Sequence, residues 1–188
     1  MLIRIRGKAD SGKVVFHMKK ILSLLLVVCM LLPFAALAED ACQIKLGQVQ
    51  WAAHGTKCFA VMTVVLKDDV IAAALIDEYQ FMAADTSTGV PNSNEAFGQS
   101  FPEGKVLASK RVNAEAYSAN MAKAGSTVAL DVNYDYIQAF CVGKTVAELE
   151  EAINGMTKET AVDAVSGATL VDTYGYLQGL LAAAKAAK

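Results

Sequence analysis

The stretch KCFAVMTVVL-KDD-VIAAALI, residues 57–76, contains two apolar segments rich in β-branched residues, separated by a polar turn. Such segments favour strands, and Asp68 and Asp69 are typical of a turn. We therefore predict a β-hairpin within a sheet region that runs from Gln48 to Phe81. Both faces of the first strand are apolar, which predicts a central strand covered by helices on at least one side.

After the hairpin the chain changes from a polar loop to a helix. Residues 82–102 include Thr, Ser and Asn clusters together with two glycines and two prolines, too many breakers for a regular element. We expect a long surface loop, the kind of segment that often has a function. From about Ser109, apolar residues recur at three- and four-residue spacing, and Gly125 is a suitable end for the predicted helix.

The sequence of the C-terminal third indicates further helices. Residues 127–130 are compatible with a short strand. Thr145 and Glu148 have the spacing of a capping box, and Asn154-Gly155 would end that helix. A last helix is predicted from Thr169 through Leu181. With no internal repeat and no domain linker, the chain is predicted to be a single α+β domain, an antiparallel sheet packed by helices after an N-terminal signal segment.

The N-terminus has the pattern of an export signal. Lys19-Lys20 precedes an apolar run from Ile21 to Leu32 and the small residues of Ala35-Ala36-Leu37-Ala38. We interpret residues 18–38 as a signal peptide, residues 1–17 as a mis-annotated extension and residues 39–188 as the functional domain. The protein is therefore expected outside the cytoplasm, in the periplasm or at the cell surface. The sequence does not decide whether the signal is cleaved or is retained as a membrane anchor.

Charge and cysteine content limit the function. Six of the 17 Lys and Arg and one of the 19 Asp and Glu precede Glu39, so residues 39–188 have 11 basic and 18 acidic side chains and a formal charge of −7. An acidic exported domain argues against nucleic-acid binding. Cys42, Cys58 and Cys141 form no Cys-x-x-Cys pair, which removes support for zinc and thioredoxin-like sites. One disulfide is possible among them, and the sequence does not choose the pair.

The segment Asp163-Ala164-Val165-Ser166-Gly167-Ala168-Thr169 is the strongest candidate for a site. It places a threonine hydroxyl after a Ser-Gly-Ala turn and at the start of the last predicted helix, where a phosphate group is well held. Gly167 and Ala168 leave no bulk beside Thr169. Serine and glycine are also ordinary residues at a helix start, so any one of them alone has little weight.

This segment resembles the Asp-x-x-Ser-Gly-Ala-Thr signature of FMN-binding domains, the family that includes flavoprotein subunits of bacterial sodium-pumping and ferredoxin-linked membrane redox complexes. More loosely, residues 54–57, 76–81 and 109–117 are similar to FMN-binding surface proteins that serve extracellular electron transfer in Gram-positive bacteria. The family pattern often continues with a second hydroxyl residue two places after the threonine, where this chain has Val171.

The resemblance implies that FMN is bound covalently, as a phosphoester of Thr169, with Asp163, Ser166, Gly167 and Ala168 as the recognition segment. A threonine hydroxyl is weakly nucleophilic and the motif includes no base. In the family, a magnesium-dependent flavin transferase with FAD as donor attaches the FMN. The implied partners are this transferase and a membrane redox partner, with association to the cell envelope, and no residue of the chain itself is expected to be catalytic.

Three functions compete. The first is an exported, flavinylated electron carrier. Under this hypothesis the chain is an electron-transfer protein and not a stand-alone enzyme. The second is a non-redox envelope interaction module in which residues 166–169 only cap a helix. A flavin reductase with its own substrate is weaker, because no Gly-x-Gly-x-x-Gly fingerprint follows a strand.

Side chains outside the motif are weaker candidates. Any of Tyr117, Tyr174 and Tyr176 could stack on a flavin ring, although a packing role is the more ordinary one for tyrosine. Lys110 and Arg111 could meet a phosphate or a partner, yet charged residues at a helix start are usually solvated. His54 precedes Gly55 and is expected to be a turn residue.

Overall fold

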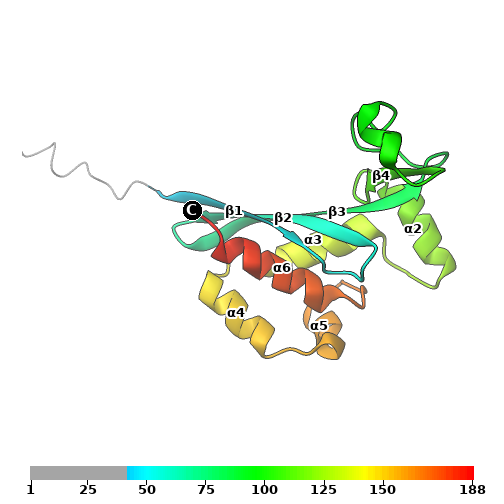
Figure 1. The fold of residues 1–188 in the computed structure, drawn as a ribbon. Helices are drawn as coiled ribbons and strands as arrows, with labels where there is room; N and C mark the ends of the chain where they lie inside the picture. Colours follow the sequence, from blue (N-terminus) through cyan, green and yellow to red (C-terminus); the bar gives the residue numbers. More distant parts are fainter. Residues whose placement is uncertain (1–41) are drawn as a thin grey trace, which may run out of the picture. The chain divides into compact units, whose positions relative to one another are not determined.

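A four-stranded antiparallel sheet with the strand order β1-β2-β3-β4 is the centre of the fold (Figure 1). The computed structural model describes residues 42–188, so the expected signal peptide (18–38) and extension (1–17) lie outside the described residues. The strands are β1 Ile44–Trp51, β2 Cys58–Lys67, β3 Val70–Ala83 and β4 Lys105–Ser109. Each pairs with its neighbour in sequence.

The predicted hairpin is confirmed as β2 and β3. Asp68 and Asp69 form its two-residue turn with φ angles of 51° and 67°, a left-handed conformation that aspartate tolerates better than most residues. β2 is an inner strand, and its buried side chains alternate with more exposed ones. Therefore only one face of this apolar strand is covered.

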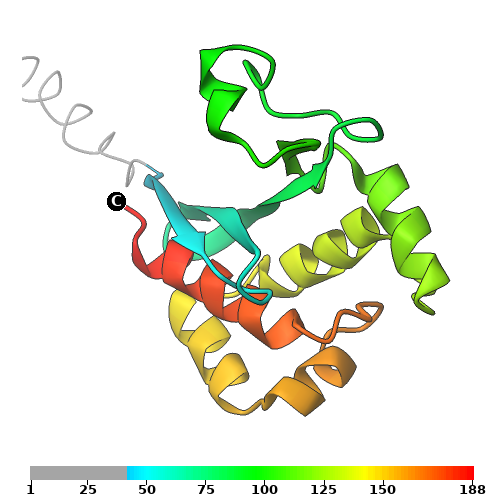
Figure 2. The same cartoon turned by 45° about the vertical axis from the view of Figure 1, so that its right-hand side comes forward.

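Helices cover that face of the sheet. They are α2 Ala114–Lys123, α3 Leu130–Cys141, α4 Val146–Asn154, α5 Lys158–Ala164 and α6 Thr173–Lys185, with a short 3-10 helix, η1 Ala96–Ser100, in the β3–β4 connection. α6 packs on β1 and β2 and α3 packs beside β3, while α4 and α5 lie outside against α6 (Figures 1 and 2). The core between the layers includes Met62, Ile76, Ile137, Leu177 and Leu180, all fully buried.

Two glycines allow α6 to approach the sheet closely. A Cβ at Gly47 in β1 would lie 1.9 Å from the backbone oxygen of Ala183, and one at Gly179 in α6 would lie 2.2 Å from Sδ of Met62. Both positions therefore require glycine for the observed packing distance.

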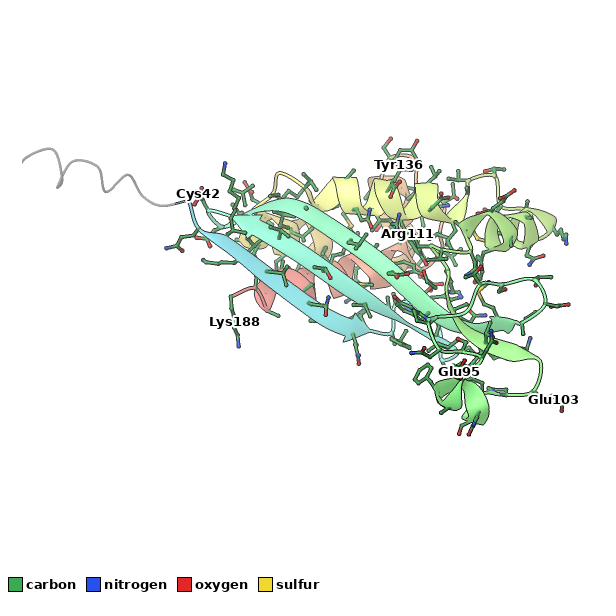
Figure 3. The ribbon with its side chains drawn as sticks, turned by 90° about the horizontal axis from the view of Figure 1, so that it is seen from above. Cys42, Glu95, Glu103, Arg111, Tyr136 and Lys188 are labelled. Atoms are coloured by element: carbon green, nitrogen blue, oxygen red, sulfur yellow. The ribbon has the colours of Figure 1, made fainter. Side chains whose placement is uncertain are left out.

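Within residues 42–188, no α-helix lies across the opposite face of the sheet, as the view in Figure 3 shows. Leu46, Leu75 and Phe81 are 55%, 48% and 41% exposed. Where β4 ends, α3 closes the edge of β3: the Ile76 N–H donates to Oε1 of Gln138, and Arg111 Nε donates to the Ile76 carbonyl oxygen. Among residues 42–188, no helix has the length and apolar character needed to span a membrane.

The predicted α+β class, with an antiparallel sheet packed by helices, is confirmed. The capping box of Thr145 and Glu148 is also confirmed at the start of α4, which ends at Asn154. Other predictions are wrong or incomplete. Residues 127–130 form no strand and lead into α3, the helix expected from Ser109 begins at Ala114 after strand β4, and neither α3 nor α5 was expected.

Candidate functional site

Thr169 lies in the loop that connects α5 to α6, and its side chain is exposed. Its backbone N–H donates to Oδ1 of Asn133 at 2.6 Å, and its hydroxyl donates to the same oxygen at 3.3 Å. Asn133 is fully buried in α3, and its Nδ2 donates to the carbonyl oxygens of Val128 and Ala129. The loop is thus held at Thr169 by one amide side chain from a distant helix.

The prediction that the last helix begins at Thr169 is wrong, because α6 begins at Thr173. Residues 170–173 instead form a turn in which the Thr173 N–H donates to the Leu170 carbonyl oxygen at 3.0 Å. The Thr173 hydroxyl donates to the same oxygen at 2.6 Å and closes the turn into α6. Thr169 is therefore a loop residue, and the helix N-terminus does not begin at its hydroxyl.

Gly167 is required by both conformation and contact. Its φ of 92° lies in the left-handed region that favours glycine. A Cβ at this position would lie 2.6–2.7 Å from three ring atoms of Tyr136, so the ring rests on the glycine backbone. Tyr136 is 43% exposed on α3 and lies on the side of that helix away from β3 (Figure 3).

The other motif residues have different surroundings. Ala168 is buried and joins the core, so its small side chain fits beneath the loop. Ser166 and Asp163 are exposed, Ser166 in the turn and Asp163 in the last turn of α5. Among the described residues, no hydrogen bond joins either of them to Thr169. The motif thus alternates between exposed residues and the buried Val165 and Ala168, with Asn133 bound to Thr169 and Tyr136 against Gly167.

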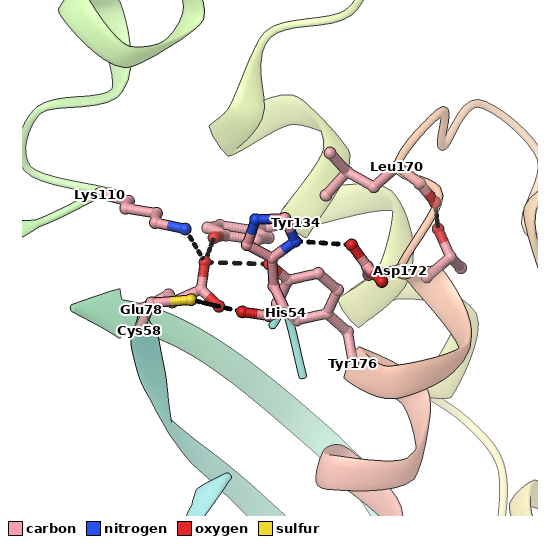
Figure 4. Close-up of polar contacts among 9 residues, drawn as sticks. His54, Cys58, Glu78, Lys110, Tyr134, Leu170, Asp172 and Tyr176 are labelled. Carbon is pink, nitrogen blue, oxygen red and sulfur yellow. Dashed lines mark hydrogen bonds and ion pairs between the residues drawn. The ribbon is translucent and has the colours of Figure 1, made fainter. Parts of the chain in front are cut away.

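A cluster of buried polar side chains joins strand β3 to helices α3 and α6 (Figure 4). Oε2 of Glu78, a fully buried carboxylate in β3, accepts from Lys110 Nζ at 2.5 Å and from the hydroxyls of Tyr134 and Tyr176 at 3.0 Å each. The Cys58 thiol lies 3.4 Å from Oε1. We call these five residues the Glu78 cluster.

The electrostatics of the cluster follow from burial and from the carboxylate. Burial raises the pKa of both tyrosines, with a further rise from the Glu78 charge. Burial opposes the charged form of Lys110, yet the adjacent Glu78 carboxylate raises its pKa above the ordinary value. Burial and Glu78 together raise the pKa of the Cys58 thiol to about 11, so this cysteine is a poor nucleophile near neutral pH.

Two basic side chains were expected at a solvated helix start, and the structure contradicts this. Lys110 is 1% exposed within the Glu78 cluster. Arg111 binds α3 through Oδ1 of Asp135 at 3.2 Å and Oε1 of Gln138 at 2.9 Å. Lys110 therefore belongs to the interior, whereas Arg111 is partly exposed and ties β3 to α3 at the edge of the sheet.

His54 lies in the β1–β2 turn, as expected, and reaches the start of α6. Its Nδ1 is 2.6 Å from Oδ2 of Asp172, the residue before Thr173. Cys42, Cys58 and Cys141 are free thiols. Over residues 42–188, no group of three or more His, Cys, Asp or Glu side chains has metal-binding geometry.

The long β3–β4 connection forms an open pocket of about 500 Å³. The pocket is lined by Ala84, Ser87 to Glu95 and Val106. Its lining residues belong almost entirely to the connection itself. Asn113 ties this segment to the body of the domain, since its side chain exchanges hydrogen bonds with the backbone of Thr88.

Asn133 and Tyr136 were not predicted as site residues from the sequence. The spacing of Leu130, Tyr134, Ile137 and Cys141, which defines the buried side of α3, could have indicated Asn133. No such signal indicates the exposed Tyr136. Of the tyrosines considered from sequence, Tyr176 is 2% exposed and bound to Glu78, which excludes it as a stacking surface.

No protein-family model matches the chain, and no curated protein or solved structure matches it. The functional interpretation therefore depends on the residues of the motif and on the geometry around them.

Proposed function

We propose that this protein is an exported electron carrier that holds FMN as a phosphoester of Thr169 and acts in membrane-associated or extracellular electron transfer. The observation that supports this most directly is the position of the Thr169 hydroxyl. It is exposed on a surface loop, yet the loop is fixed by the buried Asn133. An attachment residue needs both properties, because a modifying enzyme must reach it and the attached group must stay in place.

The surroundings of Thr169 fit a bulky phosphoester. Gly167 has no side chain, Ala168 points into the core, and Ser166 is exposed, so the hydroxyl is not crowded by its neighbours in the motif. The exposed Ser166 hydroxyl is a donor suited to a phosphate oxygen, whereas the Asn133 amide is used within the domain to hold the loop. Bound FMN would supply one- and two-electron transfer.

The attachment requires a second protein. The hydroxyl of Thr169 is hydrogen-bonded to an amide oxygen, which is not a base. Thr169 would therefore displace AMP from FAD on a flavin transferase, and a base of that enzyme would take the hydroxyl proton. After transfer, the roles of this chain are to retain the flavin and to present it to a membrane redox partner.

Intact mass tests the proposal. We expect the protein co-expressed with a flavin transferase to gain the mass of one FMN less one water, as a phosphoester requires, and Thr169→Ala to show no such gain. Thr127→Ala is the matched control, because Thr127 is also an exposed threonine outside a helix, and it should be modified like the wild type. An unmodified wild type in the presence of an active transferase would contradict the proposal.

A non-redox envelope interaction module is the alternative. The open face of the sheet favours it, because Leu46, Phe59 and Leu75 are exposed there together and exposed apolar patches often mark interaction sites. In that case residues 166–169 would only connect α5 to α6. An unmodified wild type, together with loss of partner binding in Leu75→Glu, would support this function.

A further inference from the structure

Tyr136 is the exposed aromatic residue that contacts the Thr169 loop. One side of its ring rests on Gly167, and 43% of the residue remains exposed. A ring that is fixed on one side and open on the other is a suitable surface for a second planar group.

The position of Tyr136 relative to Thr169 is set by α3. Asn133, which binds Thr169, and Tyr136 are three residues apart on this helix and so lie on neighbouring turns of one face. Gly167 and Thr169 are two residues apart, a separation of at most about 7 Å along an extended chain. The attachment hydroxyl and the tyrosine ring are therefore close neighbours.

Apolar side chains flank the same position. Val132 is 40% exposed one turn before Tyr136 on α3, and Val171 is 77% exposed two residues after Thr169. Large apolar side chains with this much exposure are favourable contacts for the edge of an aromatic ring system.

The other tyrosines named from the sequence are less suitable. Tyr176 is buried. Tyr117 and Tyr174 are only partly buried but pack against the core, and Lys110 Nζ lies 4.9 Å from the centre of the Tyr117 ring.

We infer that Tyr136 is the residue on which the isoalloxazine ring of Thr169-linked FMN stacks, with Val132 and Val171 at its edges. This inference rests on the proposed function, since it assumes that Thr169 is flavinylated. The ribityl arm would join the phosphate on Thr169 to the ring, and Tyr136 lies one turn along α3 from Asn133, the residue that binds Thr169. The second face of the flavin ring then stays open to a redox partner.

Flavin fluorescence tests the role of Tyr136 on proteins whose FMN content has first been established by intact mass. Tyrosine in contact with a flavin quenches its fluorescence by donating an electron to the excited ring, and phenylalanine does not. Tyr136→Phe keeps a ring on Gly167, so it should fold and be modified, but its fluorescence should rise at least about twofold. Tyr136→Leu should also lower the ratio of stacked to unstacked flavin by about two- to tenfold, the factor expected for one aromatic contact.

Tyr174→Phe is the control and should keep wild-type fluorescence. Modified Tyr136→Phe protein with wild-type fluorescence would overturn the inference and leave the proposed function intact. A wild type that acquires no FMN would overturn the proposed function, and the inference with it.

Discussion

Asn133 uses its side chain to join three segments of the chain. Its amide oxygen accepts two hydrogen bonds from Thr169, and its amide nitrogen donates to the carbonyl oxygens of Val128 and Ala129. A fully buried amide with all of these bonds formed fixes a loop more firmly than an apolar contact would, because each lost bond leaves a buried polar group without a partner.

Replacing Asn133 with leucine should therefore destabilise the domain and loosen the loop. We expect a loss of about 1–3 kcal/mol in the free energy of unfolding, the usual cost of leaving buried polar groups unsatisfied. Urea denaturation measures it. Asn120→Ala, at an exposed position on α2, is the control and should change stability by less than about 0.5 kcal/mol. An equal effect of both substitutions would show that Asn133 does not hold the loop.

At the scale of the elements, the distance between α6 and the sheet depends on glycine. At Gly47, the group that a Cβ would meet is the backbone oxygen of Ala183. Backbone cannot move aside by rotating a side chain, so α6 would have to shift as a whole.

Gly47→Ala is therefore expected to cost about 1–3 kcal/mol or more in stability, as overpacking does. Thermal unfolding monitored by circular dichroism measures the loss. Gly155→Ala is the matched control, because a Cβ there would lie 3.5 Å or more from its nearest neighbours and φ is −80°; its melting temperature should stay near that of the wild type. Similar melting temperatures for wild type and Gly47→Ala would contradict the observed helix–sheet distance.

Elements with local signals could be predicted from the sequence, and elements defined by distant contacts could not. The β2–β3 hairpin and the α4 capping box each have their signal within a few residues. α3 was missed because Val132, Tyr134, Tyr136 and Ile137 favour strands, so tertiary burial outweighs their local preference. The start of α6 was misplaced because the partner of Thr169 is Asn133, 36 residues away. For the same reason, the motif indicated Thr169 as the proposed attachment residue, but it indicated neither Asn133, which binds Thr169, nor the Tyr136 ring beside Gly167.

At the scale of the whole molecule, buried groups with raised pKa values make stability depend on alkaline pH. Burial raises the pKa of Cys141 from 9.0 to about 12, and burial together with Glu78 raises that of Cys58 from 9.0 to about 11. The pKa values of Tyr134 and Tyr176 are raised as well. Each group keeps its proton to a higher pH in the folded state than in the unfolded chain. Its contribution is complete below pH 9 and is lost as the pH rises through the folded-state pKa.

We therefore expect the urea midpoint to be lower at about pH 10.5 than at about pH 8. Cys141→Ala removes one of the groups responsible, so the difference between its own two midpoints should be smaller than in the wild type. Equal wild-type midpoints at the two values would contradict the buried, protonated state of these side chains.

The Glu78 cluster also limits how this domain can open. The donors to Oε2 of Glu78 come from three places in the chain: Lys110 follows β4, Tyr134 lies in α3 and Tyr176 lies in α6. If any one of these segments detaches, the carboxylate loses part of its hydrogen bonding while it is still surrounded by apolar groups. Local unfolding of α6 alone is thus penalised, and the sheet and both helices are coupled into a single cooperative unit. We therefore expect hydrogen exchange in α6, the helix that follows the Thr169 loop, to be as slow as in the β2 and β3 strands.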